Sequence, residues 1–239
     1  MKLLPFSVFL RRWAGAWLLA AAALAGPSTG RAQSASAGLW VGTVTLDKVL
    51  DPQGALAPSG GAFQFRIIFH VNTDGVVRLL RDVIVMQRDA DGNPSTAPEI
   101  ALVTDLTQLP RYTGVVRRTD GRSTGLRFAA AAYDFPGTEL AVAGKIEPEN
   151  TLDFTLDVSD TAPTNPFRHK YHPDHEKGVV FQRVVTVSFK GGTAADTATG
   201  TRRLTGTYKE TFRKLLATDV QAAGTIMLDR VSTAGKLNP

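Results

Sequence analysis

The chain has 239 residues, of which 43% are hydrophobic and 21% charged, and it contains no cysteine. These proportions are typical of a globular protein with one moderate domain, and they exclude intrinsic disorder, collagen-like repeats and a coiled coil. The lack of cysteine excludes disulfides, a cysteine-ligated zinc site, a thiol nucleophile and lipoprotein acylation.

The first 32 residues have the pattern of a secretory signal peptide. Basic residues from Lys2 to Arg12 precede the apolar run Trp13–Gly26, and small residues around Ala32 follow. The apolar run is shorter than the roughly 20 residues that a membrane-spanning helix needs, so cleavage is favoured over a membrane anchor. We therefore expect an exported protein of the periplasm, cell surface or medium, cleaved near Ala32, with no membrane span after cleavage.

Removal of this leader changes the charge balance. Residues 1–32 hold four basic groups and no acidic one, so that 23 of the 27 basic groups remain against 22 acidic groups. A nucleic-acid-binding domain needs a basic surface, and a nearly neutral mature chain gives no sign of one. The sequence therefore predicts no nucleic-acid partner.

From Gly38 onward, polar and apolar residues alternate with a period of two, which is typical of half-buried strands. Asp74-Gly75 predicts a tight hairpin turn, and the doubled Leu79-Leu80 predicts a bulge or burial on both faces. Nine segments follow the strand pattern: Gly38–Leu46, Phe63–Val71, Val76–Met86, Leu126–Tyr133, Glu139–Ile146, Leu152–Val158, Val179–Phe189, Arg203–Phe212 and Gly224–Val231.

Residues 88–124 are the least regular part of the sequence. Pro94, Pro98 and Pro110 interrupt any strand pattern there. We expect long loops in this region, with one helical turn near Thr104–Gln108.

The strand pattern predicts one all-β domain over residues 38–233, after a short linker at 33–37 and before a tail at 234–239. Because most neighbouring strands are joined by short turns, the sheet must close or stack to protect its edges. We predict an antiparallel up-and-down β-barrel. A two-sheet β-sandwich is the alternative, since both folds need alternating faces.

Three charged residues fall in the inward phase of the last predicted strands: Arg183, Glu210 and Arg230. A buried unpaired charge costs several kcal/mol, so we expect these residues to pair. One interpretation is a structural ion pair that caps the core. The other is a polar floor of a ligand cavity, also lined by Tyr208, in which the arginines face an anionic group.

Three of the four histidines lie in the loop Asn165–Glu176, as His169, His172 and His175, beside Asp174. Imidazole is the commonest metal ligand near neutral pH, so the cluster predicts a candidate site for a divalent transition metal such as zinc. The loop contains two prolines and has no HExxH helix pattern. A purely structural loop and a catalytic loop therefore remain alternatives.

Motifs of enzyme activity are otherwise lacking in the sequence. No GxSxG nucleophile elbow and no glycine-rich phosphate loop after a strand occur. Only the histidine loop offers catalytic chemistry, and no catalytic residue is predicted. The sequence predicts no further cofactor.

The segment Gly38-Leu39-Trp40 and the basic Arg230 near the end of the last predicted strand resemble the lipocalin-like (calycin) pattern. In that family a tryptophan near the base of the barrel is covered by a basic side chain of the final strand. The resemblance implies a cation–π contact between Trp40 and Arg230 with a structural role.

Longer segments resemble exported bacterial β-domain proteins of uncharacterised function. These segments are GLWVGTVTLDKV, FRIIFHVNTDGVVRLL, NPFRHKYHPDHE and GTYKETF with GTIMLDRV. The resemblance implies an exported β module and no particular activity. We therefore predict a non-enzymatic binding or structural module, whose partner is a small ligand or a cell-envelope component. A metal-binding protein or metal-dependent hydrolase that uses the histidine loop is the alternative.

Overall fold

The structure is a computed structural model that describes residues 34–51, 54–88, 99–114, 116–117, 119–120, 123–169, 171–190 and 202–239. The predicted signal peptide, residues 1–32, lies outside the described residues. No helix within these ranges is both long and apolar enough to cross a membrane.

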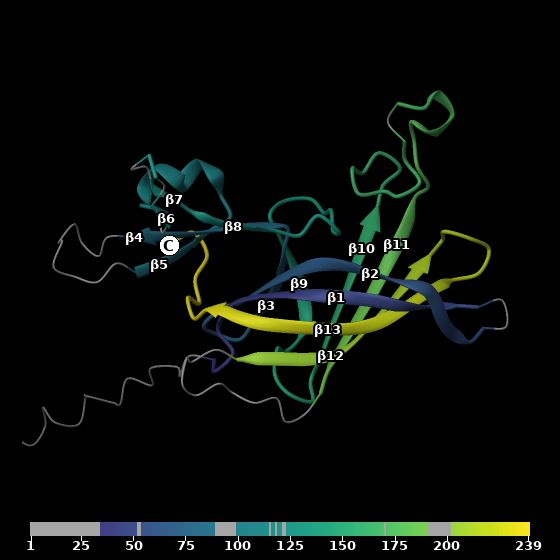
Figure 1. Cartoon of the computed structure of the whole chain (residues 1–239), viewed down its shortest axis with the longest axis horizontal. Coiled ribbons are helices and arrows are strands. Elements are labelled where there is room, and N and C mark those ends of the chain that lie inside the picture. Colours follow the sequence, from purple (N-terminus) through teal and green to yellow (C-terminus); the bar gives the residue numbers. More distant parts are fainter. Residues whose placement is uncertain are drawn as a thin grey trace, which may run out of the picture. The chain divides into compact units, whose positions relative to one another are not determined.

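Eight strands form a closed antiparallel barrel (Figure 1). Around the barrel they are β1 (Gly38–Leu50), β13 (Val220–Ser232), β12 (Arg203–Arg213), β11 (Phe181–Phe189), β10 (Thr151–Val158), β9 (Glu139–Gly144), β3 (Val77–Leu80) and β2 (Leu56–Val71). Strands that follow one another in the chain are neighbours, and β13 pairs with β1 to close the sheet. The predicted up-and-down barrel is therefore confirmed, and the sandwich is excluded.

One insertion, residues 81–138, separates β3 from its barrel neighbour β9. It contains a three-stranded sheet with the order β5 (Glu99–Val103), β4 (Asp82–Arg88) and β8 (Leu126–Ala129), and a small pair of β6 (Val116–Arg117) and β7 (Ser123–Thr124). A 3-10 helix, Leu106–Arg111, lies close to the predicted helical turn. The expectation of long loops over 88–124 was wrong for β5, whose alternation is too short to show in the sequence.

One predicted strand is divided in the structure, and three others are shorter than expected: β8, β9, which ends at Gly144, and β11, which begins at Phe181. The segment Val76–Met86 divides at Arg81 into β3 and β4, and Leu79 and Leu80 are both fully buried. The doubled leucine therefore marks burial on both faces, as predicted. The segment predicted to run to Tyr133 ends as a strand at Ala129, after which the chain turns back towards the barrel.

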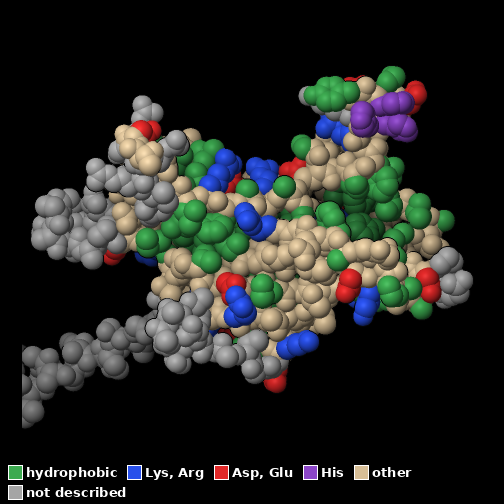
Figure 2. All heavy atoms as spheres, viewed as in Figure 1, with side chains coloured by type: hydrophobic (Ala, Val, Ile, Leu, Met, Phe, Trp, Pro, Cys, Tyr) green, Lys and Arg blue, Asp and Glu red, His purple; other side chains and the backbone are tan. Residues whose placement is uncertain are grey.

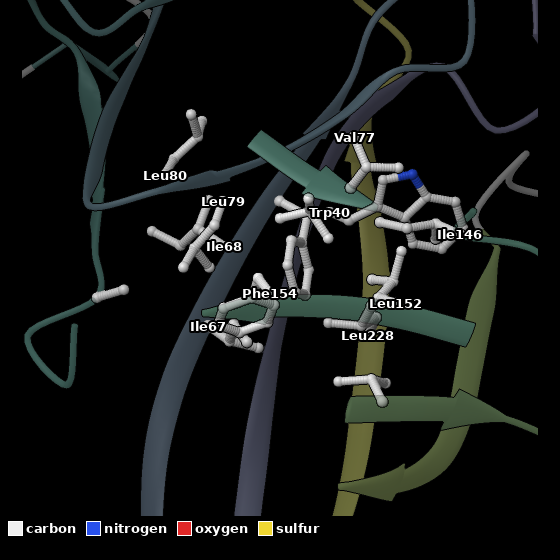
Figure 3. Close-up of a cluster of buried hydrophobic side chains, with 14 of the residues drawn as sticks. Trp40, Ile67, Ile68, Val77, Leu79, Leu80, Ile146, Leu152, Phe154 and Leu228 are labelled. Atoms are coloured by element: carbon white, nitrogen blue, oxygen red, sulfur yellow. The ribbon is translucent and has the colours of Figure 1, made fainter. Parts of the chain in front are cut away.

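The barrel interior is filled with apolar side chains at alternate strand positions. Strand β10 shows the pattern most clearly, because Leu152, Phe154, Leu156 and Val158 are buried and the residues between them are exposed. The same core continues into the insertion through Val83 of β4. Figure 3 shows part of this cluster, in which side chains from several strands meet around Phe154.

Residues on both sides of the predicted domain belong to the fold. The indole Nε1–H of Trp40 donates to the Ser36 carbonyl oxygen at 2.8 Å. Residues 233–239, which we call the closing segment, run beside β5, where Leu237 pairs with Leu102. The residues that the sequence assigned to a tail thus pack on the insertion sheet.

The turn between β2 and β3 forms where Asp74-Gly75 predicted it. The Asn72 side-chain oxygen accepts hydrogen bonds from the backbone N–H groups of Asp74 and Val76, both at 2.9 Å. Gly75 has a positive φ of 86°, a conformation that glycine adopts at little steric cost. This turn lies at the barrel end where β1 begins.

Candidate functional site

The opposite end of the barrel, which we call the mouth, is where β10 and β12 end and β11 and β13 begin. Two of the predicted inward charges meet there. The Arg183 Nη2 donates to Glu210 Oε2 at 3.2 Å, and the Arg183 Nε donates to Glu210 Oε1. Glu210 is fully buried and Arg183 nearly so. The predicted pairing of these two residues is therefore present.

Two tyrosines extend this ion pair into a buried polar chain. The Tyr208 hydroxyl donates to Glu210 Oε2 at 3.0 Å, and the hydroxyls of Tyr133 and Tyr208 lie 3.0 Å apart. Because the Tyr208 hydroxyl donates its hydrogen to the carboxylate, its oxygen accepts the hydrogen bond that the Tyr133 hydroxyl donates. Every member of the chain has a partner, which offsets much of the cost of burying polar groups here.

Tyr133 comes from the insertion and closes the mouth. We call residues 130–138 the plug segment. The Tyr133 ring is fully buried and lies edge-on to Phe65 and Phe154, at centroid distances of 5.7 and 5.9 Å. The Arg183 Cζ lies 4.8 Å from the centre of the Tyr133 ring, and Arg183 Nη1 donates to the Ala132 carbonyl oxygen at 2.5 Å. Arg183 thus holds the plug segment by its ring and its backbone.

The buried polar chain shifts the ionisation of its members. Burial raises the pKa of Tyr133 and of Tyr208 well above the ordinary value, so both phenols stay neutral. Burial alone would lower the pKa of Arg183, but the neighbouring Glu210 raises it, and the guanidinium stays charged. The mouth therefore holds one fixed ion pair and two neutral hydroxyls.

The sequence did not identify Tyr133 as a site residue. Its segment was predicted to be a strand, and nothing in its alternation shows that the ring enters another part of the fold. A proline–glycine pair follows at Pro136-Gly137 and marks the turn, but a turn alone does not show where the preceding side chain points.

The third predicted inward charge, Arg230, does not join this group, which corrects the expectation of a three-residue cluster. Arg230 lies opposite Trp40 in the β13–β1 pairing, at the far end of the barrel. Its Cζ is 5.8 Å from the centre of the Trp40 ring, and its Nη1 donates to the Ala35 carbonyl oxygen at 2.7 Å. The cation–π contact expected from the lipocalin-like pattern is thus present, whereas a place for Arg230 at the mouth is not.

The histidine loop lies at the tip of the arm between β10 and β11, where Figure 2 shows histidine side chains gathered on the surface. The rings of His172 and His175 have centroids 4.8 Å apart, and those of His169 and His172 are 6.1 Å apart. All three are exposed. Within the part of the chain that the structure describes, no three histidine, aspartate or glutamate side chains are placed to hold a metal ion.

Hydrogen bonds to the backbone fix the base of this arm. The buried Asn165 side chain donates to the carbonyl oxygens of Ser159 and Val179, at 2.9 and 2.8 Å. Arg168 donates to the Thr161 carbonyl oxygen at 2.7 Å. At the tip, the His172 ring accepts the backbone N–H of Asp174 through Nδ1, so this nitrogen is already engaged. These contacts describe an ordered loop whose rings are not turned towards one point.

Comparison with protein-family models and with curated proteins finds no match to this chain.

Proposed function

We propose that this protein is an exported, non-enzymatic binding module that takes up a small apolar or amphiphilic ligand at the mouth of the barrel. The observation that carries the proposal is the position of Phe63. This ring continues the inward-facing row of β2 and contacts Phe65 at a centroid distance of 5.9 Å, yet 64% of the residue is exposed. An uncovered aromatic side chain in a core position favours an apolar partner when other apolar side chains are exposed around it.

Other apolar side chains are exposed at the same end. Leu216, in the loop between β12 and β13, is 66% exposed, and Val180, just before β11, is 59% exposed. Figure 2 shows hydrophobic side chains at the surface below the histidines. A ligand held by this rim would lie directly over the plug segment, with the charge of Arg183 beneath it.

The neutral fluorophore N-phenyl-1-naphthylamine provides a direct test. We expect saturable binding to the protein, weakened at least about tenfold by Phe63→Ser, because a lost aromatic contact costs on the order of 1.4 kcal/mol or more. Val76→Ser is the matched control, since Val76 is 47% exposed at the other end of the barrel. No binding, or equal losses in the two variants, would refute the proposal.

Export is part of this proposal and has its own test. We expect the protein expressed with its leader to be recovered outside the cytoplasm, with Gln33 as the first residue by mass spectrometry. Recovery of the uncut chain from the cytoplasm alone would contradict it.

Metal binding by the histidine loop is a second candidate, supported by the closeness of the three rings. Because His172 Nδ1 is engaged by the backbone of Asp174, binding would use other nitrogens and require the rings to turn. Equilibrium dialysis against zinc tests it: one bound ion that is lost in His172→Ala supports a site. Zinc that does not bind, or that binds equally to the variant, removes it.

A further inference from the structure

A pocket lies at the barrel end opposite the mouth, next to Trp40. It has a volume of about 260 Å³ and is lined by Trp40, Ile146, Glu147, Pro148, Arg202, Arg203 and Leu204. Figure 3 shows the indole of Trp40 next to Ile146. The wall therefore combines an apolar part with two guanidinium groups, which is the composition of a small-ligand site.

The arginines around this pocket differ in whether a carboxylate neutralises their charge. Arg203 pairs with Asp229 through two hydrogen bonds, at 2.7 and 3.0 Å. Arg202 has no ion pair or side-chain hydrogen bond with any residue in the described ranges. Arg230, over Trp40, reaches only a backbone carbonyl, and its buried Nε has no partner within those ranges.

Arg202 and Arg230 are close enough to repel each other. Burial lowers the pKa of Arg230, and the charge of Arg202 lowers it further. The guanidinium of Arg230 nevertheless keeps its charge at neutral pH. Glu147 is the one carboxylate among the pocket-lining residues, and it makes no ion pair with either arginine. The pocket thus has an excess of positive charge beside an apolar wall.

We propose that this pocket binds a small carboxylate that carries an apolar group. The fork of Arg202 would hold the carboxylate, and Arg230 would contribute its charge from the side of Trp40. Ile146, Pro148 and Leu204 would cover the apolar group. The site is separate from the mouth, and the proposal adds to the barrel a second ligand site that selects for an anionic group.

The indole Nε1–H of Trp40 is a suitable reporter by NMR, since it donates to Ser36 at the rim of this end. The full chain with Trp13→Phe and Trp17→Phe leaves one indole signal, which is then titrated with hexanoate, acetate and inorganic phosphate at constant ionic strength. We expect a saturable shift with hexanoate, weaker binding of acetate, and phosphate binding that is weaker than that of hexanoate. Phosphate binding that is tighter than that of hexanoate would assign the pocket to a phosphate instead and overturn the proposal.

Two substitutions with opposite expected effects on affinity distinguish a change in binding from a loss of folding. Arg202→Gln should weaken hexanoate binding about tenfold, the loss expected for one charge-assisted hydrogen-bond pair. Glu147→Gln should tighten it by about threefold, because it removes the opposing carboxylate. Arg66→Gln is the matched control, because Arg66 is an exposed arginine on β2 that does not line the pocket. This variant should bind hexanoate with the affinity of the parent.

No shift of the Trp40 signal with any of the three anions would overturn the site. So would equal weakening by Arg202→Gln and Arg66→Gln, since this would show only a general effect of net charge. A Glu147→Gln variant that binds hexanoate no better than the parent would show that Glu147 does not oppose the bound carboxylate. This would overturn the assigned position of the ligand.

Discussion

Arg183 and Glu210 face the interior of the barrel, where an uncompensated charge is costly. The two side chains form a two-pronged pair, and Tyr208 and the Ala132 carbonyl use the remaining hydrogen-bonding capacity. A buried pair of this kind adds little net stability over apolar residues of similar volume. Its more direct consequence is that Arg183 fixes the position of the plug segment.

Removal of one member of the ion pair should therefore lower the free energy of unfolding much more than removal of both members. Arg183→Leu leaves Glu210 buried without a cation and should lower the free energy of unfolding by about 3–5 kcal/mol. Arg183→Leu combined with Glu210→Leu should recover at least half of that loss. Urea denaturation of the two variants measures this. A single variant that loses less than about 1 kcal/mol would show that the pair is solvated.

The two buried tyrosines should make the stability of the protein depend on pH in alkaline solution. The pKa of Tyr133 and of Tyr208 is raised by burial above the value of 10.0 that each has when unfolded. The stability that this contributes is complete below pH 10 and is lost as the pH rises further, because the unfolded phenols release their protons first. Spectrophotometric titration should show two of the four tyrosines ionising only as the protein unfolds. Four phenols that titrate together in the folded protein would contradict the buried chain.

At the scale of elements, the closing segment connects the barrel to the insertion sheet. The Asn238 side-chain oxygen accepts the backbone N–H groups of Thr104 and Asp105, and its backbone N–H donates to Leu102. At the other end of the segment, His70 Nε2 lies 3.2 Å from the Ala234 carbonyl oxygen. Because a carbonyl only accepts, Nε2 carries the proton, and the buried Nδ1 has no partner among the described residues.

Acid should therefore loosen the closing segment. Burial lowers the pKa of His70 below its ordinary value of 6.5, and this effect outweighs the hydrogen bond to Ala234 and the charge of Glu139, which both raise the pKa, while Arg78 lowers it further. The contribution of a neutral His70 to stability is complete above pH 6.5 and is lost as the pH falls towards the lower pKa of the folded state. His70→Gln keeps a donor for Ala234 and does not titrate. The free energy of unfolding should fall more between pH 7.5 and pH 5 in the parent than in His70→Gln, and equal falls would refute the assignment.

At the scale of the whole molecule, barrel and insertion share a hydrophobic core that includes Leu102 of β5 and Leu228 of β13, and the insertion has a smaller cluster of its own around Met86, Val103 and Tyr112. Leu102→Ala should therefore lower the stability of the barrel as well, by about 2–5 kcal/mol. Denaturation followed by circular dichroism and by the Trp40 signal should give coincident transitions in both proteins. An insertion that melts separately from the barrel would contradict the shared core.

The sequence allowed the barrel to be predicted, because the faces of its strands differ so strongly in polarity. Alternation also identified Arg183 and Glu210 as inward residues. It did not reveal that Arg230 lies at the other end, because phase gives the direction of a side chain and not its height along the barrel. Tyr133 could not be found, since its position depends on how an insertion of irregular loops folds back. The histidine cluster was visible in the sequence, but ring orientation depends on local hydrogen bonds such as that of His172 to Asp174.

The phenol of Tyr133 fills part of the barrel interior beside Phe65 and Phe154, and it is tethered to the same chain. Under the proposed function, a guest that entered beyond Phe63 would have to displace this ring, and its measured affinity would be weaker than its intrinsic affinity by the fraction of molecules in which Tyr133 has moved out. This competition would make the barrel selective among guests. A guest that reproduced the hydroxyl contact with Tyr208 and the ring contact with Arg183 would replace what Tyr133 supplies, whereas a plain hydrocarbon chain that entered this far would leave both contacts without a substitute.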